Sequence, residues 1–244
     1  MAELAERQES NGPLCVAITG ASGALGQALL RAWHRRGARL IALTTSPEPL
    51  ALSDADGQAI PLQQVPWQVG GEQALRAVLH GVDVLVLNHG VNLHGRRDAE
   101  ATALSLEVNA LSGWRLLELF AELGQGRAPG RPRPEVWVNT SEAEIEPALS
   151  PLYEISKRLM GQLLSLRALD LNRHLRLRRL VLGPFRSALN PVGLMGPQFV
   201  ANQILLQAGL GLNLIIVTPN PLVFVLMPLT TLGRWIYFRL LTRA

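Results

Sequence analysis

Apolar residues along the chain fall into short continuous runs, separated by longer stretches with helical spacing. Runs that are apolar at successive positions predict strands covered on both faces. The stretches between them repeat apolar residues every three or four positions and predict helices. The predicted strands cover residues 14–19, 39–45, 82–88, 135–139, 175–182 and 213–218, and the predicted helices cover residues 24–36, 100–123, 153–169 and 198–208.

This alternation of strands and helices predicts an α/β fold with a doubly wound parallel sheet. We expect residues 13–210 to form a single domain of this class. Residues 211–244 are expected to add a last strand and an apolar, basic C-terminal segment. Residues 1–12 form a polar leader that contains three glutamates and no apolar core, unlike a signal peptide. We therefore expect a cytoplasmic protein that is not secreted, with peripheral membrane contact left open.

Composition narrows the class of protein further. Hydrophobic residues make up 48% of the chain and charged residues 17%, which excludes an intrinsically disordered protein. Cys15 is the only cysteine, so a disulfide framework is excluded, and the five histidines have no zinc-binding spacing. We expect no metal site.

The charge is unevenly distributed along the chain. The formal net charge is +4, yet residues 171–244 contain no acidic side chain. A basic segment of this kind suits either nucleic acid or an anionic membrane. Its arginines alternate with aliphatic runs rather than with base-stacking aromatic residues, so we expect no nucleic-acid partner and favour a membrane surface. These arginines are Arg173, Arg176, Arg178, Arg179, Arg186, Arg234, Arg239 and Arg243.

Residues 19–26 read TGASGALG and lie directly after a predicted strand, at the start of a predicted helix. In this context the pattern predicts a dinucleotide site. Gly20 suits the tight turn, Gly23 allows a pyrophosphate to approach the backbone, and Gly26 allows close packing of the helix. The helix N-terminus would supply N–H donors for the phosphates. The alternative is an ordinary strand–helix turn that is rich in glycine.

The end of the second predicted strand bears on which dinucleotide binds. An acid at this position would bind the ribose 2′-hydroxyl of NAD, but the first acid after the strand is Glu48. The hydroxyl groups of Thr45 and Ser46, together with Arg36 and Arg39, favour NADP, and NAD stays open.

The sole lysine of the chain, Lys157, lies four residues after Tyr153, one of only two tyrosines. The other 22 basic residues among the 23 are arginines. Residues four apart share a face of a helix, and a neighbouring cation acidifies a phenol, which makes it a proton donor and acceptor. The pair therefore predicts acid–base chemistry. The alternative is a surface lysine on an amphipathic helix.

With this Tyr-x-x-x-Lys pair and the glycine motif, the chain resembles the short-chain dehydrogenase/reductase family over about residues 14–210. Residues 88–90 (Asn-His-Gly) resemble the family's Asn-Ala-Gly, with His89 in the place of a small residue. Asn109 matches the family's asparagine on the long helix. Residues 182–187 (LGPFRS) resemble the turn that touches the nicotinamide, with a leucine in place of the first proline.

The resemblance implies a Rossmann-like fold and a role for each matched residue. Tyr153 would pass a proton to a carbonyl while NADPH delivers hydride, Lys157 would lower the tyrosine pKa, and Asn109 would hold a relay water. Ser141 would orient the carbonyl, although it lies one residue nearer to the tyrosine than is usual, and Thr140 is the fallback. The implied cofactor-binding residues are Gly20, Ser22, Gly23, Leu25, Gly26, Thr45, Ser46, Asn88, Gly90, Phe185 and Ser187. We interpret the acids that follow Ser141, which are Glu142, Glu144 and Glu146, as a solvated loop.

The C-terminal segment is unusual for this family. Its apolar run at residues 222–229 is interrupted by Pro228 and is too short to cross a bilayer. Trp235 and Tyr237 beside arginines suit a helix that lies in a membrane interface. A lid over the substrate or a dimer interface is the alternative, and homo-oligomers are common in the family.

The C-terminal half is also similar to the reductase portion of cyanobacterial proteins in which such a domain accompanies a sterol-desaturase-like hydroxylase. This chain has no hydroxylase histidine cluster. Together these features predict an NADP(H)-dependent oxidoreductase that interconverts a carbonyl and an alcohol on an apolar, lipid-like small molecule. The rival hypothesis is a nucleotide-binding scaffold at a membrane surface that catalyses nothing.

Overall fold

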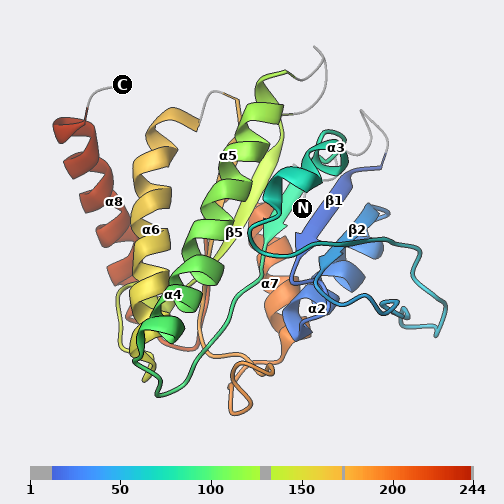
Figure 1. Cartoon of the computed structure of the whole chain (residues 1–244), viewed down its shortest axis with the longest axis horizontal. Coiled ribbons are helices and arrows are strands. Elements are labelled where there is room, and N and C mark those ends of the chain that lie inside the picture. The colour runs from blue at the N-terminus through green and yellow to red at the C-terminus, as the bar shows by residue number, and fades with distance from the viewer. Residues whose placement is uncertain (1–12, 127–132, 172–173, 243–244) are drawn as a thin grey trace.

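The computed structural model describes residues 13–126, 133–171 and 174–242. The predicted leader at residues 1–12 lies outside this range. A seven-stranded sheet with the strand order β3-β2-β1-β4-β5-β6-β7 forms the centre of the molecule, and every pairing in it is parallel (Figure 1). The strands are β1 (Cys15–Thr19), β2 (Arg39–Thr44), β3 (Gln63–Pro66), β4 (Val84–Leu87), β5 (Glu135–Ser141), β6 (Arg176–Leu182) and β7 (Leu214–Val217).

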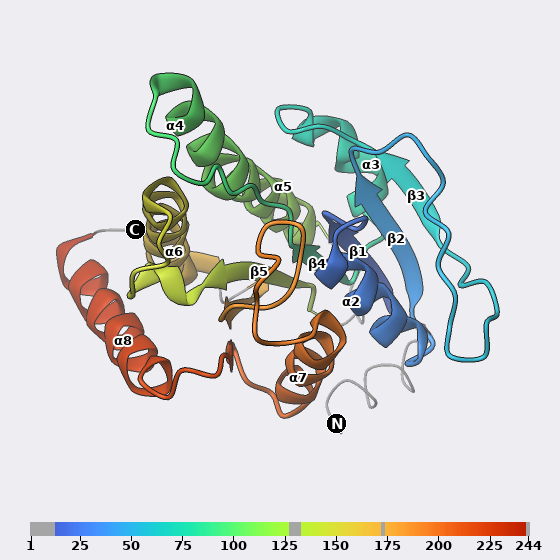
Figure 2. The same ribbon diagram turned by 90° about the horizontal axis from the view of Figure 1, so that it is seen from below.

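Helices cover both faces of this sheet (Figure 2). One face carries α2 (Ala24–His34) and α7 (Pro197–Gly209). The other face carries α3 (Arg76–Leu79), α4 (Ala99–Leu106), α5 (Ser112–Gln125) and α6 (Pro151–Leu171), with α8 (Val223–Leu241) packed beside α6. Three short turns complete the set: η1 (Glu72–Leu75), the π-helical η2 (Glu107–Leu111) and η3 (Glu142–Glu144). The predicted doubly wound α/β fold is confirmed.

Strand β1 shows why continuous apolar runs were the useful signal. Its five residues are all buried. Val16 and Ile18 pack with α2 and α7 on one face, whereas Cys15 and Ala17 pack with α5 on the other. Because successive strand residues point to opposite faces, a strand between two helical layers is apolar at successive positions, as Cys15 to Ile18 are here.

Strand β3 and helix α3 were missed by the sequence analysis. Strand β3 lies at the edge of the sheet, has two glutamines, and ends in Pro66. Proline cannot donate to a strand ladder and is confined to such edges. A short, half-polar edge strand carries no continuous apolar run, so the pattern that found the central strands could not find this one.

Several arginines of the acid-free segment pair with acids from earlier in the chain, and two others, Arg173 and Arg243, lie outside the described residues. Arg178 forms a 2.7 Å ion pair with Glu135, and both side chains are inaccessible to solvent. Arg179 and Arg234 both pair with Glu144. The predicted basic surface is therefore smaller than the charge count suggests, because these three arginines lie mostly inside the protein, paired with two carboxylates.

Candidate active site

The predicted site residues gather at the carboxyl edge of the sheet. The glycine turn follows β1, Asn88 follows β4, Ser141 ends β5, and residues 183–187 follow β6. In an all-parallel sheet these ends lie along one edge, where open α/β sheets bind their ligands.

The glycine turn has the backbone geometry that its sequence predicts. Gly20 adopts a φ of +60°, which suits glycine, and a Cβ there would lie 2.9 Å from the Cα of His89. At Gly26 a Cβ would lie 2.3 Å from the Gly20 carbonyl oxygen. Any side chain at either position would therefore push the turn apart.

Helix α2 begins at this turn with features that fit a phosphate. Its N-cap is Gly23, so no side chain caps its first N–H groups, and its first turn holds no acid. A Cβ on Gly23 would meet only the Gly20 carbonyl oxygen, at 3.3 Å. Uncapped N–H groups and the helix dipole together attract an anion. The side chain of Leu25 is buried in the core, so only its backbone is available to a nucleotide.

The end of β2 presents hydroxyl groups and no acid. The Thr44 hydroxyl lies 3.2 Å from the Ser22 hydroxyl, which joins this strand to the glycine turn. Thr45 is exposed beside it, and the Ser46 hydroxyl accepts a hydrogen bond from the Glu48 N–H. These groups lie where the adenosine ribose binds in folds of this class.

The expected support from Arg36 and Arg39 was wrong. Arg39 is the first residue of β2, and Arg36 follows α2. Both therefore lie at the amino edge of the sheet, and Arg36 donates a hydrogen bond to the Leu205 carbonyl there. Closeness in sequence misled the prediction, because a six-residue strand separates Arg39 from the end of β2 by about 17 Å.

A hydrogen-bond network joins the end of β4 to the middle of the α4–α5 helix. Asn88 accepts a hydrogen bond from Asn139 and donates one to the Gly20 carbonyl. The buried Asn109 side chain bonds both the N–H and the carbonyl of Val91. At Gly90 a Cβ would lie 3.1 Å from Asn109 Oδ1, so glycine allows this approach.

Asn109 lies inside the π-helical turn η2, which interrupts the predicted long helix. Its amide also donates to the Ser156 hydroxyl at 3.0 Å, and that hydroxyl donates to the Tyr153 carbonyl. The Asn109 side chain thus supports the helix turn that carries Tyr153. Such π-turns are frequent at functional sites.

Tyr153 and Lys157 lie one turn apart on α6 and face the end of β5. The Lys157 ammonium donates to the Asn139 carbonyl at 3.0 Å and lies 5.5 Å from the centre of the Tyr153 ring. The Ser141 side chain acts on the Tyr153 phenol by hydrogen bonding that lowers its pKa, and the Ser141 hydroxyl also donates to the Leu182 carbonyl at 3.3 Å. Thr140, the fallback, instead donates to the Leu180 carbonyl within the sheet. The geometry therefore brings Ser141, rather than Thr140, to the tyrosine.

Burial is the largest cause of the pKa shifts of Tyr153 and Lys157. It raises the pKa of Tyr153 above its usual value, and the hydrogen bond with Ser141 opposes that shift. Burial also lowers the pKa of Lys157 to about 8, against the attraction of the Glu144 carboxylate. A lysine of this kind gains and loses its proton close to neutral pH.

Comparisons with known proteins agree with this geometry. Residues 16–129 match the model of the NAD dependent epimerase/dehydratase family. The chain is also 43% identical over 228 residues to the monoglucosyldiacylglycerol epimerase of Synechocystis, a match that covers 93% of this chain and 55% of that protein. The chain belongs to the short-chain dehydrogenase/reductase family. It spans about half the length of this curated relative.

Solved structures of the short-chain dehydrogenase/reductase family share the fold. A short-chain dehydrogenase from Sphingobium yanoikuyae in complex with NADPH gives a TM-score of 0.73 at 16% identity, covering 95% of this chain and 97% of that one. One from Burkholderia cenocepacia in complex with NADP gives 0.73 at 18% identity, covering 95% and 98%. The expected nicotinamide dinucleotide is consistent with these matches and with the open, uncapped glycine turn.

The acids after Ser141 are not a solvated loop, contrary to the prediction. Each of the three binds the C-terminal part of the chain. Glu144 is buried and pairs with Arg234 of α8 at 2.8 Å. Glu142 accepts a hydrogen bond from Thr218, and Glu146 accepts one from Asn220. Burial raises the pKa of Glu142. The turn that follows Ser141 is therefore fastened to the segment that leads into α8.

Three other residues complete the site without having been predicted. The Thr19 hydroxyl accepts hydrogen bonds from the N–H groups of Asn88 and His89. Nδ1 of His89 lies 2.8 Å from that hydroxyl, and burial lowers the pKa of His89 to about 4, so the ring is neutral. Asn139 connects Asn88 to Lys157. The only signal for Asn139 was its place directly before Thr140 and Ser141 at the polar end of β5.

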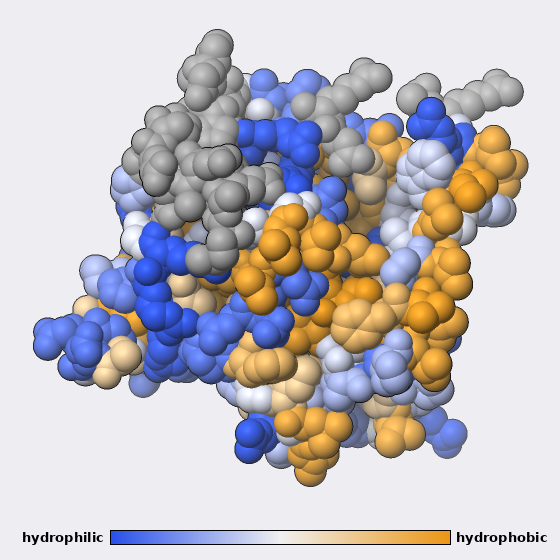
Figure 3. All heavy atoms as spheres, turned by 180° about the vertical axis from the view of Figure 1, so that it is seen from behind, coloured by the Kyte–Doolittle hydropathy of each residue, from blue (hydrophilic) through white to orange (hydrophobic). Residues whose placement is uncertain are grey.

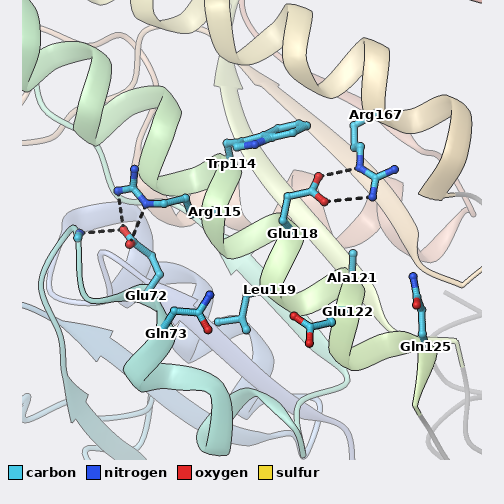
Figure 4. A pocket seen from close by; sticks show the side chains of 11 residues that line it. Glu72, Gln73, Trp114, Arg115, Glu118, Leu119, Ala121, Glu122, Gln125 and Arg167 are labelled. Atoms are coloured by element: carbon cyan, nitrogen blue, oxygen red, sulfur yellow. Dashed lines mark hydrogen bonds and ion pairs between the residues drawn. The ribbon is translucent and has the colours of Figure 1, made fainter. Parts of the chain in front are cut away.

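A groove on the outer face of α5 lies apart from these residues (Figure 4). None of the predicted site residues lines it. Its charged groups are satisfied by one another: Arg115 pairs with Glu72, and Arg167 pairs with Glu118. Burial alone would raise the pKa of Glu72, but hydrogen bonds from Arg115 and Ser112 outweigh it and lower that pKa to about 2. We assign no chemistry to this groove.

Proposed function

We propose that this protein is an NAD(P)-dependent oxidoreductase of the short-chain class that interconverts an alcohol and a carbonyl on the sugar head group of a glycolipid. The arrangement of Tyr153, Lys157 and Ser141 beside an open glycine turn carries the proposal. The lipid substrate class is supported by the 43% identical relative, whose name is monoglucosyldiacylglycerol epimerase.

When bound, the nicotinamide dinucleotide accepts or donates the hydride. The residues of this chain then move the proton. Tyr153 takes the proton of the sugar hydroxyl as the C–H hydride leaves, and returns it when the carbonyl is reduced. Lys157 favours the phenolate through its charge, and Ser141 donates a hydrogen bond to the carbonyl oxygen.

An epimerase needs both directions of this step at one carbon. Oxidation removes the hydride from one face of the carbon, and reduction returns it to the other face. Such a cycle consumes no net cofactor. This cofactor balance agrees with the relative's name. An epimerase would show no net NAD(P)H turnover, whereas a reductase would consume NAD(P)H.

Preference between NADP and NAD rests on the hydroxyl groups of Thr45 and Ser46 and on the missing acid after β2. Because Arg36 and Arg39 lie at the amino edge of the sheet, they do not contribute to cofactor preference, and the preference for NADP is smaller than the sequence alone suggested. The rival hypothesis is a scaffold that catalyses nothing. Burying the Lys157 ammonium costs stability, and a scaffold would gain no function from it, which argues against the rival.

Replacement of the site tyrosine tests this proposal. Tyr153→Phe removes one hydroxyl, and we expect it to lower turnover of monoglucosyldiacylglycerol by roughly a thousandfold while cofactor affinity is unchanged. Tyr237→Phe is the matched control, since Tyr237 is exposed on α8. The products are separated by chromatography, and the released sugars identify epimerisation or oxidation.

Cofactor binding without turnover of any sugar lipid by the wild-type protein would contradict the proposal and favour the scaffold. Equal activity of Tyr153→Phe and Tyr237→Phe would contradict the assigned chemistry.

A further inference from the structure

We propose that the outer face of α8 docks on the surface of a lipid bilayer, with the helix lying in the plane of the interface. This inference goes beyond the proposed reaction and does not depend on it, because its evidence comes from the surface of α8 alone.

Helix α8 turns a mixture of apolar and polar side chains toward the protein. Val223 and Met227 are buried, and Thr230, Thr231, Arg234 and Phe238 are half-buried. The positions turned away are apolar and exposed along the whole helix, as Figure 3 shows at its right-hand edge. We call these outward residues the apolar face: Phe224, Val225, Leu229, Leu232, Trp235 and Ile236.

The orientation of α8 is fixed by its polar contacts. Arg234 pairs with the fully buried Glu144, and α8 packs along α6. Rotating the helix to bury its apolar face would break this ion pair, leaving Glu144 with Arg179 alone, and would also expose the buried Val223 and Met227. The apolar face therefore stays outward and needs a partner outside this fold.

The charged side chains on the exposed surface of α8 indicate what kind of partner this surface contacts. Residues 222–242 contain two charged side chains, Arg234 and Arg239, and Arg234 is neutralised by Glu144. Arg239 remains exposed, with its guanidinium 5.3 Å from the centre of the Trp235 ring. The exposed surface of α8 thus combines the apolar face, which includes Trp235, with the cation of Arg239 and no acid in residues 222–242, and this combination complements an anionic lipid surface.

The helix suits lying on a bilayer rather than crossing it. No helix in residues 13–126, 133–171 and 174–242 is both long and apolar enough to span a membrane. Pro228 also interrupts the hydrogen bonding of α8.

Docking through α8 would bring the candidate active site close to the lipid. Helix α8 begins just after β7, at the carboxyl edge of the sheet. At the same edge the loop between β6 and α7 exposes Val192 and Leu194, which are 87% and 72% accessible. A head group at the bilayer surface would thus lie near the edge that holds Tyr153.

Flotation with vesicles of phosphatidylcholine, with and without phosphatidylglycerol, tests this inference. The full chain should float with the anionic vesicles. The double variant Leu229→Ser/Leu232→Ser should lower the partition coefficient at least about tenfold. The control is Leu104→Ser/Leu111→Ser, which removes two exposed leucines at α4 and η2 that are 42% and 38% accessible, compared with 60% and 53% for Leu229 and Leu232; it should float like the wild type. Arg239→Gln should lower binding to anionic vesicles by roughly fivefold and leave the weaker binding to neutral vesicles unchanged.

Fluorescence quenching by brominated lipid gives a readout that does not depend on folding of the double variants. Quenching should occur in the wild type and vanish in Trp235→Phe, since Trp235 is the tryptophan on the apolar face. Failure of the wild type to bind either vesicle would overturn the inference, as would equal loss in both double variants. A wild-type dimer that the α8 variant dissociates, with no vesicle binding, would assign the face to a second copy of the chain instead. None of these readouts requires catalysis, so a failed docking test leaves the proposed reaction standing.

Discussion

Helices α2 and α8 have similar apolar content and opposite surroundings. Helix α2 buries seven of its eleven residues, among them Leu25, Leu29 and Trp33, against the sheet and α7. Helix α8 is longer, yet it buries only Val223 and Met227. It exposes ten large apolar side chains, whereas α2 exposes none.

The difference shows that two kinds of interaction hold helices in this protein. Burial of apolar surface holds α2, as is usual for a helix of a globular domain. Helix α8 is held by the ion pair of Arg234 with Glu144 and by the buried side chains of Val223 and Met227, while its other large apolar side chains are mostly exposed. Thr218 and Asn220, which precede α8, donate hydrogen bonds to the turn after Ser141. The apolar side chains of α2 are buried within the fold, whereas most of those of α8 are exposed on the surface, where a partner can contact them.

The pair of tryptophans Trp33 and Trp235 sharpens this comparison with the largest expected effect. Trp33→Ala should lower the free energy of unfolding by about 4 kcal/mol, because it removes a fully buried ring. Trp235→Ala should change it by less than about 0.5 kcal/mol, because that ring is exposed. Urea unfolding followed by circular dichroism measures both. A loss at Trp235 as large as that at Trp33 would mean that α8 is part of the core.

Removal of the ion pair tests how α8 is held. Glu144→Gln leaves Arg234 and Arg179 buried without their common carboxylate, and should destabilise the protein by about 3 kcal/mol. Hydrogen exchange should rise along α8 more than along α2. Glu146→Gln is the control, because it can still accept the hydrogen bond from Asn220. Unchanged exchange along α8 in Glu144→Gln would show that other contacts fix the helix.

Gly26→Ala probes the nucleotide side of the comparison. The added Cβ would lie 2.3 Å from the Gly20 carbonyl oxygen, so we expect a loss of about 2 kcal/mol in stability and weaker cofactor binding. At Gly233 of α8 a Cβ meets nothing within 4 Å. Gly233→Ala should therefore be neutral or slightly stabilising. Thermal unfolding of both variants checks this, and equal behaviour would contradict the tight packing of the turn.

The smallest predicted effect is a pH dependence of stability that comes from Lys157. Its pKa is about 8 in the folded protein and 10.5 when unfolded. Between these values the unfolded chain binds more protons, so stability rises with pH. From pH 8 to pH 9 the gain should be about 1 kcal/mol.

Lys157→Met should lack this rise, and the difference between the two unfolding curves isolates it from other groups. Parallel curves for the two proteins across this range would show that Lys157 keeps its ordinary pKa.

Much of the central fold could be predicted, because β1, β2 and β4 lie between two helical layers and each contains a continuous apolar run. The same reasoning found the glycine turn and the pair of Tyr153 and Lys157, since their spacing is local in sequence. The edge strand β3 carries no such run and was missed.

The remaining errors concern contacts between distant segments. The sequence placed Arg39 beside Ser46 by proximity, whereas the strand carries it to the opposite edge. It treated Glu144 as solvated, because its partner Arg234 lies 90 residues further along the chain. Ion pairs of this kind leave no periodic pattern in a single sequence.

Titration of the purified protein with NADPH and with NADH, followed by nicotinamide fluorescence, tests most directly whether the carboxyl edge is a dinucleotide site. We predict saturable binding of NADPH, tighter than that of NADH, and weaker binding of both in Gly26→Ala. Binding of neither dinucleotide to the wild-type protein would contradict the account.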